Sequence, residues 1–152
     1  MSSRLFINLR ERNGLAYYVR TLNEDYSDSG YLTTQAGVPI AKAEAAVKII
    51  LAEYKRLTTE LIGAKELKRA KDLLQGKSLL QMEATDNLAT WYARQAVLRR
   101  KILTPGEFLK KINKVTANEL RVVARKIFVN SGLNLALIGQ IKADRFKDIL
   151  KF

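Results

Sequence analysis

Apolar residues change their spacing several times along the chain, and each change predicts a different element. Near the start, apolar positions that include Leu5 and Leu9 recur every three or four residues, which predicts a helix over residues 2–12 with one buried face. Two runs rich in aromatic and branched residues follow at 15–22 and 31–36, with turn-forming residues between them. We therefore expect an antiparallel hairpin directly after the first helix.

Helical spacing dominates the middle of the chain. The expected helices cover about 40–58, about 64–101 with an interruption at 85–87, a segment that begins after Thr104 and a segment that begins after Thr116. The last two have the clearest start signals. Thr104 and Thr116 each stand three residues before a glutamate, so hydroxyl and carboxylate can satisfy the amide groups that a first helical turn leaves free. Pro105 also suits the first position of its helix.

The end of the chain predicts one more strand and one more helix. The apolar run 133–138 is typical of a buried strand ended by Gly139, and a short helix is expected at about 143–151. The order of elements predicts an α+β fold, an antiparallel sheet with helices packed on one face, within a single domain over 1–152. Three strands make a thin sheet for so much helix. We therefore expect a fold truncated at its N-terminus, the C-terminal part of a larger two-domain protein.

Missing residue types limit the chemistry that this chain can perform alone. The sequence has no cysteine and no histidine, which removes thiol catalysis and the most frequent ligands of transition metals. We expect no metal ligand and no cofactor-binding residue in this chain. No apolar run approaches the roughly 20 residues that cross a bilayer, and the start lacks the pattern of a signal peptide. We expect no membrane partner; the compartment stays open, with the cytoplasm favoured slightly.

A net charge of +12 suggests a nucleic-acid partner, but the charge is unevenly distributed. Residues 1–37 are neutral, and the densest basic stretch, 99–126, carries nine basic residues against Glu107 and Glu119. Lysines scattered over the outer faces of amphipathic helices usually form a solvated surface. We favour that interpretation and expect no nucleic-acid partner, with a basic nucleic-acid-binding module kept as an alternative.

The opening segment carries the most specific pattern. It reads MSSRLF at 1–6 and LRERNGLAY at 9–17, and it resembles the second domain of the pitrilysin and insulinase type of zinc metallopeptidases. Mitochondrial processing peptidases and bacterial zinc proteases belong to that family. Further landmarks follow in family order at 26–30, 66–71, 115–120 and 137–139. The resemblance therefore covers nearly the whole chain.

The resemblance implies a division of labour between two domains. In this family the zinc lies in the first domain, on a His-x-x-Glu-His motif that a chain without histidine cannot contain. The second domain closes over it to form a chamber and contributes an arginine and a tyrosine seven residues apart, here Arg10 and Tyr17. The full-length protein is then expected to be a metalloendopeptidase that hydrolyses peptides or unfolded polypeptides. This chain alone is expected to be inactive.

The chemistry of the two residues agrees with that role. Arg10 offers fixed N–H donors and Tyr17 a neutral hydroxyl donor, so together they could bind a peptide carbonyl and stabilise the negative oxygen that develops there. The alternative from spacing alone is that Tyr17 packs in the sheet and Arg10 pairs with a surface carboxylate. The expected partners are a peptide substrate and the zinc-binding domain of the same protein or of a partner subunit, with a homodimer also open. A second alternative is a non-catalytic family member that acts as a partner or scaffold subunit.

Overall fold

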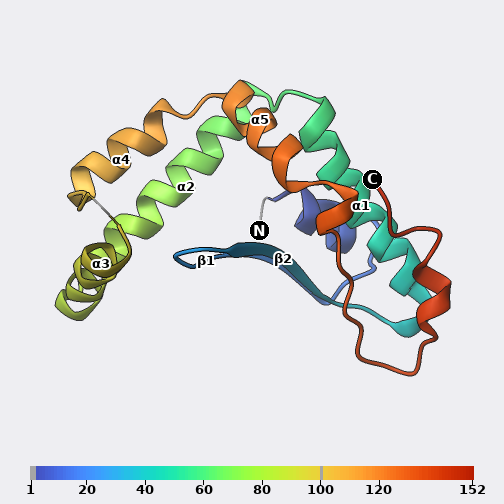
Figure 1. The fold of residues 1–152 in the computed structure, drawn as a ribbon. Coiled ribbons are helices and arrows are strands. Elements are labelled where there is room, and N and C mark those ends of the chain that lie inside the picture. Colours follow the sequence, from blue (N-terminus) through green and yellow to red (C-terminus); the bar gives the residue numbers. More distant parts are fainter. Residues whose placement is uncertain (1–2, 100) are drawn as a thin grey trace. The chain divides into compact units, whose positions relative to one another are not determined.

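The structure is a computed structural model that describes residues 3–99 and 101–152. Met1, Ser2 of the expected first helix and Arg100 of the basic stretch lie outside the described residues. The chain forms two compact units, one of Met1–Glu60 with Arg121–Phe152 and one of Leu61–Leu120. Figure 1 shows the elements of both in chain order.

The first unit begins with a π-helix, η1 (Phe6–Arg12), where the sequence predicts an ordinary helix. Leu5 and Leu9 are buried as expected, but a spacing of four residues fits α- and π-helical turns alike, so the pattern could not distinguish them. The predicted end of the helix at residue 12 is confirmed: η1 ends at Arg12, Gly14 follows with a φ of +54°, and the Leu15 N–H donates to the Leu9 carbonyl oxygen at 2.7 Å.

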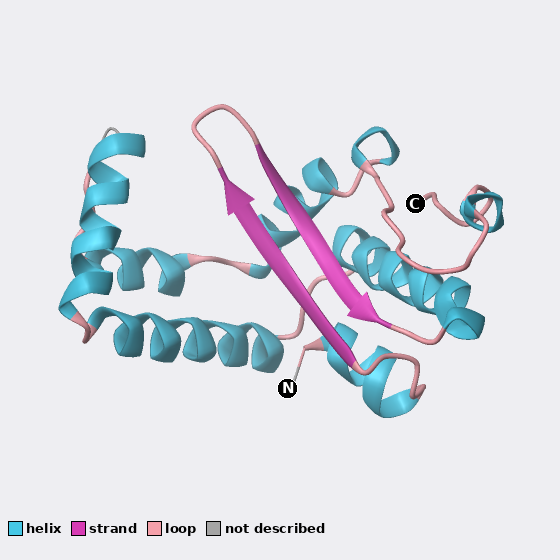
Figure 2. Ribbon diagram, turned by 90° about the horizontal axis from the view of Figure 1, so that it is seen from below, coloured by secondary structure: helices cyan, strands magenta, loops and turns pink. Residues whose placement is uncertain are grey.

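An antiparallel hairpin follows, formed by β1 (Tyr18–Asp25) and β2 (Gly30–Gly37), as Figure 2 shows. The connecting turn is closed by the Tyr26 N–H, which donates to the Ser29 carbonyl oxygen at 2.9 Å. One face of the hairpin meets the helices: Val19 packs against the η1 core, and Thr34 hydrogen-bonds to Tyr54 of α1 (Ala43–Thr59). The hairpin and the helices on its face place this unit in the predicted α+β class.

Helix α1 follows the short 3₁₀ turn η2 (Ile40–Lys42) and separates two small hydrophobic clusters. Ala46 faces the cluster that holds the end of η1, whereas Val47 and Leu51 face a cluster around Phe146. The first cluster consists of Leu5, Leu9, Leu15, Ala16 and Ala46. The helix therefore positions the start of the chain on one side and its last residues on the other.

Two predictions for the end of the chain are wrong. Leu133–Ile138 forms no strand among the described residues: Leu133 and Leu135 pack against the Phe146 cluster, but Ile138 is fully exposed. An apolar run cannot show whether a neighbouring strand exists to share its hydrogen bonds. The helix expected at 143–151 is only the 3₁₀ turn η4 (Ala143–Phe146), because so short a segment gains few helical hydrogen bonds. The 3₁₀ turn η3 (Asn130–Gly132) precedes both segments.

The second unit is helical. It contains α2 (Ala64–Met82), α3 (Thr85–Leu98), α4 (Pro105–Lys114) and the first residues of α5 (Ala117–Ile127). Helix α4 lies alongside α2, where Lys71 and Gln75 donate to Asn113 at 2.7 Å each (Figure 1). The two predicted capping boxes are confirmed, since the Thr104 and Thr116 hydroxyls accept from the amides three residues on, at 3.2 Å. No helix of the described residues is long and apolar enough to cross a membrane.

Candidate functional site

Arg10 lies in the last turn of η1, where the sequence places it, with its side chain exposed. Its guanidinium carbon stands 5.2 Å from the centre of the Phe6 ring, one turn earlier on the same helix. Within residues 3–99 and 101–152, no carboxylate pairs with it. The N–H donors of Arg10 therefore face solvent, and the alternative of a surface ion pair does not describe this side chain.

Tyr17 lies directly before β1, and the residue is 84% exposed. Its backbone is nevertheless fixed, because the Tyr17 N–H donates to the Gly37 carbonyl oxygen at 2.9 Å. The alternative that Tyr17 packs in the sheet is wrong. The next residue, Tyr18, does make a contact within the hairpin: a Cβ added to Gly37 would lie 2.6 Å from the Tyr18 ring, so the ring covers that glycine.

The segment between Arg10 and Tyr17 is anchored along its length. Leu15 and Ala16 are buried in the same cluster as Leu9, and the Lys42 ammonium donates to the Gly14 carbonyl oxygen at 3.1 Å. A hydrogen-bonded connector, buried at Leu15 and Ala16, thus carries an exposed guanidinium at one end and an exposed phenol at the other. Among the described residues the two side chains make no hydrogen bond to each other.

Sequence reasoning missed a polar network beneath this connector. Glu53 of α1 is buried, and its Oε1 accepts from the Asn8 side-chain amide at 2.7 Å and from Arg56 Nη1 at 3.1 Å. The Asn8 carbonyl oxygen in turn accepts from the Asn13 side chain at 2.7 Å, next to the Gly14 turn. A sequence signal for this network was a charged residue, Glu53, directly before Tyr54, which lies on the apolar face of the predicted helix at 40–58.

The charged side chains near the network form ion pairs with one another, and Arg56 bonds to two carboxylates. Arg56 also donates to the exposed Glu60, and these hydrogen bonds raise the pKa of Arg56 and lower the pKa of Glu60. On the hairpin, Arg20 Nε donates to Gln35 Oε1 at 3.0 Å, so the two residues form a cross-strand pair. The described residues contain no group of three acidic, cysteine or histidine side chains that could hold a metal ion.

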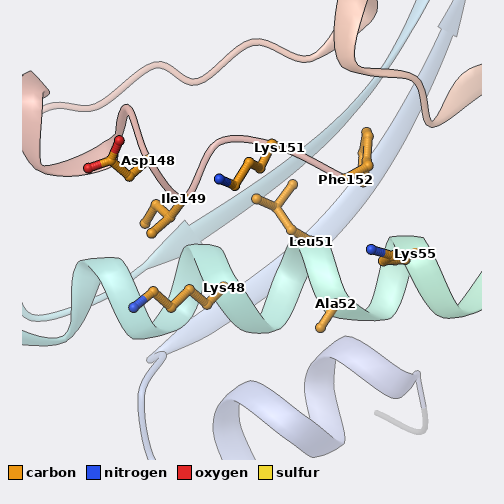
Figure 3. A pocket seen from close by; sticks show the side chains of 8 residues that line it. All are labelled: Lys48, Leu51, Ala52, Lys55, Asp148, Ile149, Lys151 and Phe152. Atoms are coloured by element: carbon orange, nitrogen blue, oxygen red, sulfur yellow. The ribbon is translucent and has the colours of Figure 1, made fainter.

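A shallow cavity of about 240 Å³ in the first unit lies away from both candidate residues. Figure 3 shows it between α1 and the last residues of the chain, with Leu51, Ile149 and Phe152 among its lining side chains. Neither Arg10 nor Tyr17 lines it. The candidate site is therefore an exposed pair on a rigid connector and not this cavity.

Comparison with known proteins gives consistent relatives. Residues 1–74 match the family described as Peptidase M16 inactive domain. The chain is 32% identical over 139 residues to an uncharacterised zinc protease, YmxG, of Bacillus subtilis, which covers 91% of this chain and 34% of that protein. It is 30% identical over 140 residues to the mitochondrial-processing peptidase subunit alpha-2 of Dictyostelium discoideum, covering 92% of this chain and 31% of that one. The chain thus spans about a third of the length of these relatives.

A solved structure has a similar fold. A conserved protein from Enterococcus faecalis V583 superposes with a TM-score of 0.72 at 25% identity, over 82% of this chain and 29% of that protein. The matched segment of the family begins at the first residue and includes η1, the hairpin and α1. The opening motif, the profile match and the extended alignments agree, and the chain belongs to the M16 peptidase family as its inactive domain.

Proposed function

We propose that this chain supplies substrate-binding and transition-state-stabilising groups to a zinc-dependent endopeptidase. The zinc would be held by another domain or subunit, since this chain has neither histidine nor cysteine. When bound there, the zinc supplies the activation of water and the polarisation of a peptide carbonyl. The observation that carries the proposal is the exposure of Arg10 and Tyr17 at the two ends of an anchored connector in a domain of the M16 family.

The role of the two residues follows from their donors. A guanidinium presents several N–H groups in a fixed plane, and a phenol remains a neutral O–H donor at working pH. Donors held in place before the reaction lower the cost of the charge that forms on the carbonyl oxygen. The anchored backbone of Tyr17 and the packed turn at Gly14 provide that fixed placement.

The test is hydrolysis of an internally quenched peptide by the complete peptidase. We expect Arg10→Ala and Tyr17→Phe to lower kcat/KM by about 10²- to 10³-fold each, with the larger part in kcat. Tyr18→Phe is the matched control, since the Tyr18 ring covers Gly37 and its hydroxyl is not part of the proposed site. Unchanged kcat/KM in both Arg10→Ala and Tyr17→Phe would remove the proposed role.

A second candidate function is that of a non-catalytic partner subunit. It is supported by the similarity to a processing-peptidase alpha subunit, whose name places it in an assembly of subunits. In that case the Arg10 and Tyr17 variants would leave hydrolysis by the assembled enzyme intact. The two functions are therefore separated by the same pair of variants.

A further inference from the structure

Glu53 is unusual for a charged residue in a small domain. Its side chain is 9% exposed, and among the described residues it is the charged group that the core buries. Burial of a carboxylate is unfavourable unless hydrogen bonds and opposite charges compensate it. Arg56 provides one such partner at 3.1 Å, and the Arg4 guanidinium lies 4.0 Å from Glu53 Oε2. Arginines of both α1 and the start of the chain therefore compensate the buried negative charge.

Asn8 connects this carboxylate to the end of η1. Its amide nitrogen donates to Glu53 at 2.7 Å, its amide oxygen accepts from Arg12 at 3.3 Å, and its carbonyl oxygen accepts from the Asn13 side chain at 2.7 Å. Arg12 is the last residue of the π-helix, and Asn13 is its C-cap. One buried acceptor on α1 thus fixes, through Asn8, the turn that contains Arg10.

Because η1 is a π-helix, this anchoring affects the direction of Arg10. A π-helical turn is wider than an α-helical one and is rarely stable without support from its surroundings. If η1 relaxed to an α-helix, each later residue would rotate about the helix axis, and Arg10 would point in another direction. We propose that Glu53 is a positioning residue, which holds residues 6–12 in π-helical form through Asn8 and so sets the direction of Arg10. This inference rests on the proposed function of Arg10.

The first test measures η1 directly in this 152-residue chain by amide hydrogen exchange. Glu53→Ala and Asn8→Ala should each accelerate exchange of the amides of 6–12 by about 10-fold or more, while β2 amides keep their protection. Glu60→Ala is the matched control, because Glu60 is also a carboxylate bound to Arg56 but is 52% exposed. Equal exchange in the parent and in Asn8→Ala, the milder of the two changes, would overturn the inference.

The second test asks whether Glu53 acts through Arg10 in the complete peptidase. Glu53→Ala should lower kcat/KM by about 10- to 100-fold in the parent but by less than about 2-fold in an Arg10→Ala background. Glu53→Gln, which keeps an acceptor for Asn8, should recover part of the loss. A general loss of stability predicts the same factor in both backgrounds, and that result would overturn the positioning role.

The two tests separate this inference from the proposed function. If Arg10→Ala leaves kcat/KM unchanged, the proposed role of Arg10 fails, and the exchange measurement still decides whether Glu53 holds η1. If Arg10→Ala is impaired but Glu53→Ala and Asn8→Ala are not, the function stands and the positioning role is wrong.

Discussion

Leu9 is the side chain on which the placement of η1 depends most. It is 0% exposed and lies in the cluster that also contains Leu15 and Ala46. Replacing a fully buried leucine by alanine removes its transfer free energy and leaves a cavity, which costs about 3–5 kcal/mol. A domain of this size has a total stability of about 5–15 kcal/mol, so Leu9→Ala should remove a large share of it.

The matched comparison is Ile138→Ala in the same unit. Ile138 is 107% exposed, so its truncation should change the free energy of unfolding by less than about 0.5 kcal/mol. Had the segment formed the buried strand that the sequence predicts, the cost would instead approach that of Leu9→Ala. The two substitutions therefore compare a correct and an incorrect prediction of burial directly.

The assay must report on the first unit. Trp91 is the one tryptophan of the sequence and lies in the second unit, so its fluorescence would not follow this unfolding. Urea unfolding followed by far-ultraviolet circular dichroism, with hydrogen exchange of α1 amides, is suitable. With a slope of about 1.5 kcal/mol/M, Leu9→Ala should lower the midpoint by roughly 2–3 M. A loss below about 1 kcal/mol for Leu9→Ala would refute the packing described for η1.

Two further predictions concern the helix caps and the hairpin. The amide and hydroxyl of Thr104 lower the pKa of Glu107, and the Thr116 groups do the same for Glu119. The caps therefore stabilise their helices at pH values above 4.5, the ordinary pKa of a glutamate, and they lose that effect as the pH falls below it. Circular dichroism from about pH 6 to about pH 3 should show this loss of helix, and glutamine at both positions should remove that part of the pH dependence; equal curves would contradict the capping role. Gly37→Ala should cost about 1 kcal/mol because its Cβ meets the neighbouring tyrosine ring at 2.6 Å, and a cost that persists after that ring is truncated to alanine would contradict this reason.

Sequence patterns predicted the elements whose signals are local. The Thr104 and Thr116 boxes, the end of the first helix at residue 12 and the hairpin each depend on residues close together in the chain, and each was confirmed. The strand at 133–138 was wrong because a strand needs a distant partner that the pattern cannot supply. The family of the chain was also predictable, because its opening motif, LRERNGLAY, is contiguous in the sequence and is therefore a local signal like the helix caps.

The exposed pair and its support illustrate the limit of that reasoning. Arg10 and Tyr17 were identified through the resemblance that the contiguous opening motif carries, but Glu53 reaches Asn8 across forty-five positions, and no local pattern marks that contact. A relative could therefore keep the arginine and the tyrosine and still lose the buried acceptor. Its motif would be intact, but under the proposed function the guanidinium would lie on an unsupported helix, and ordering its donors during the reaction would cost conformational entropy. If the proposed roles hold, the motif alone is a weaker criterion for a competent site than the motif together with a buried carboxylate on α1 and an asparagine amide that donates to it.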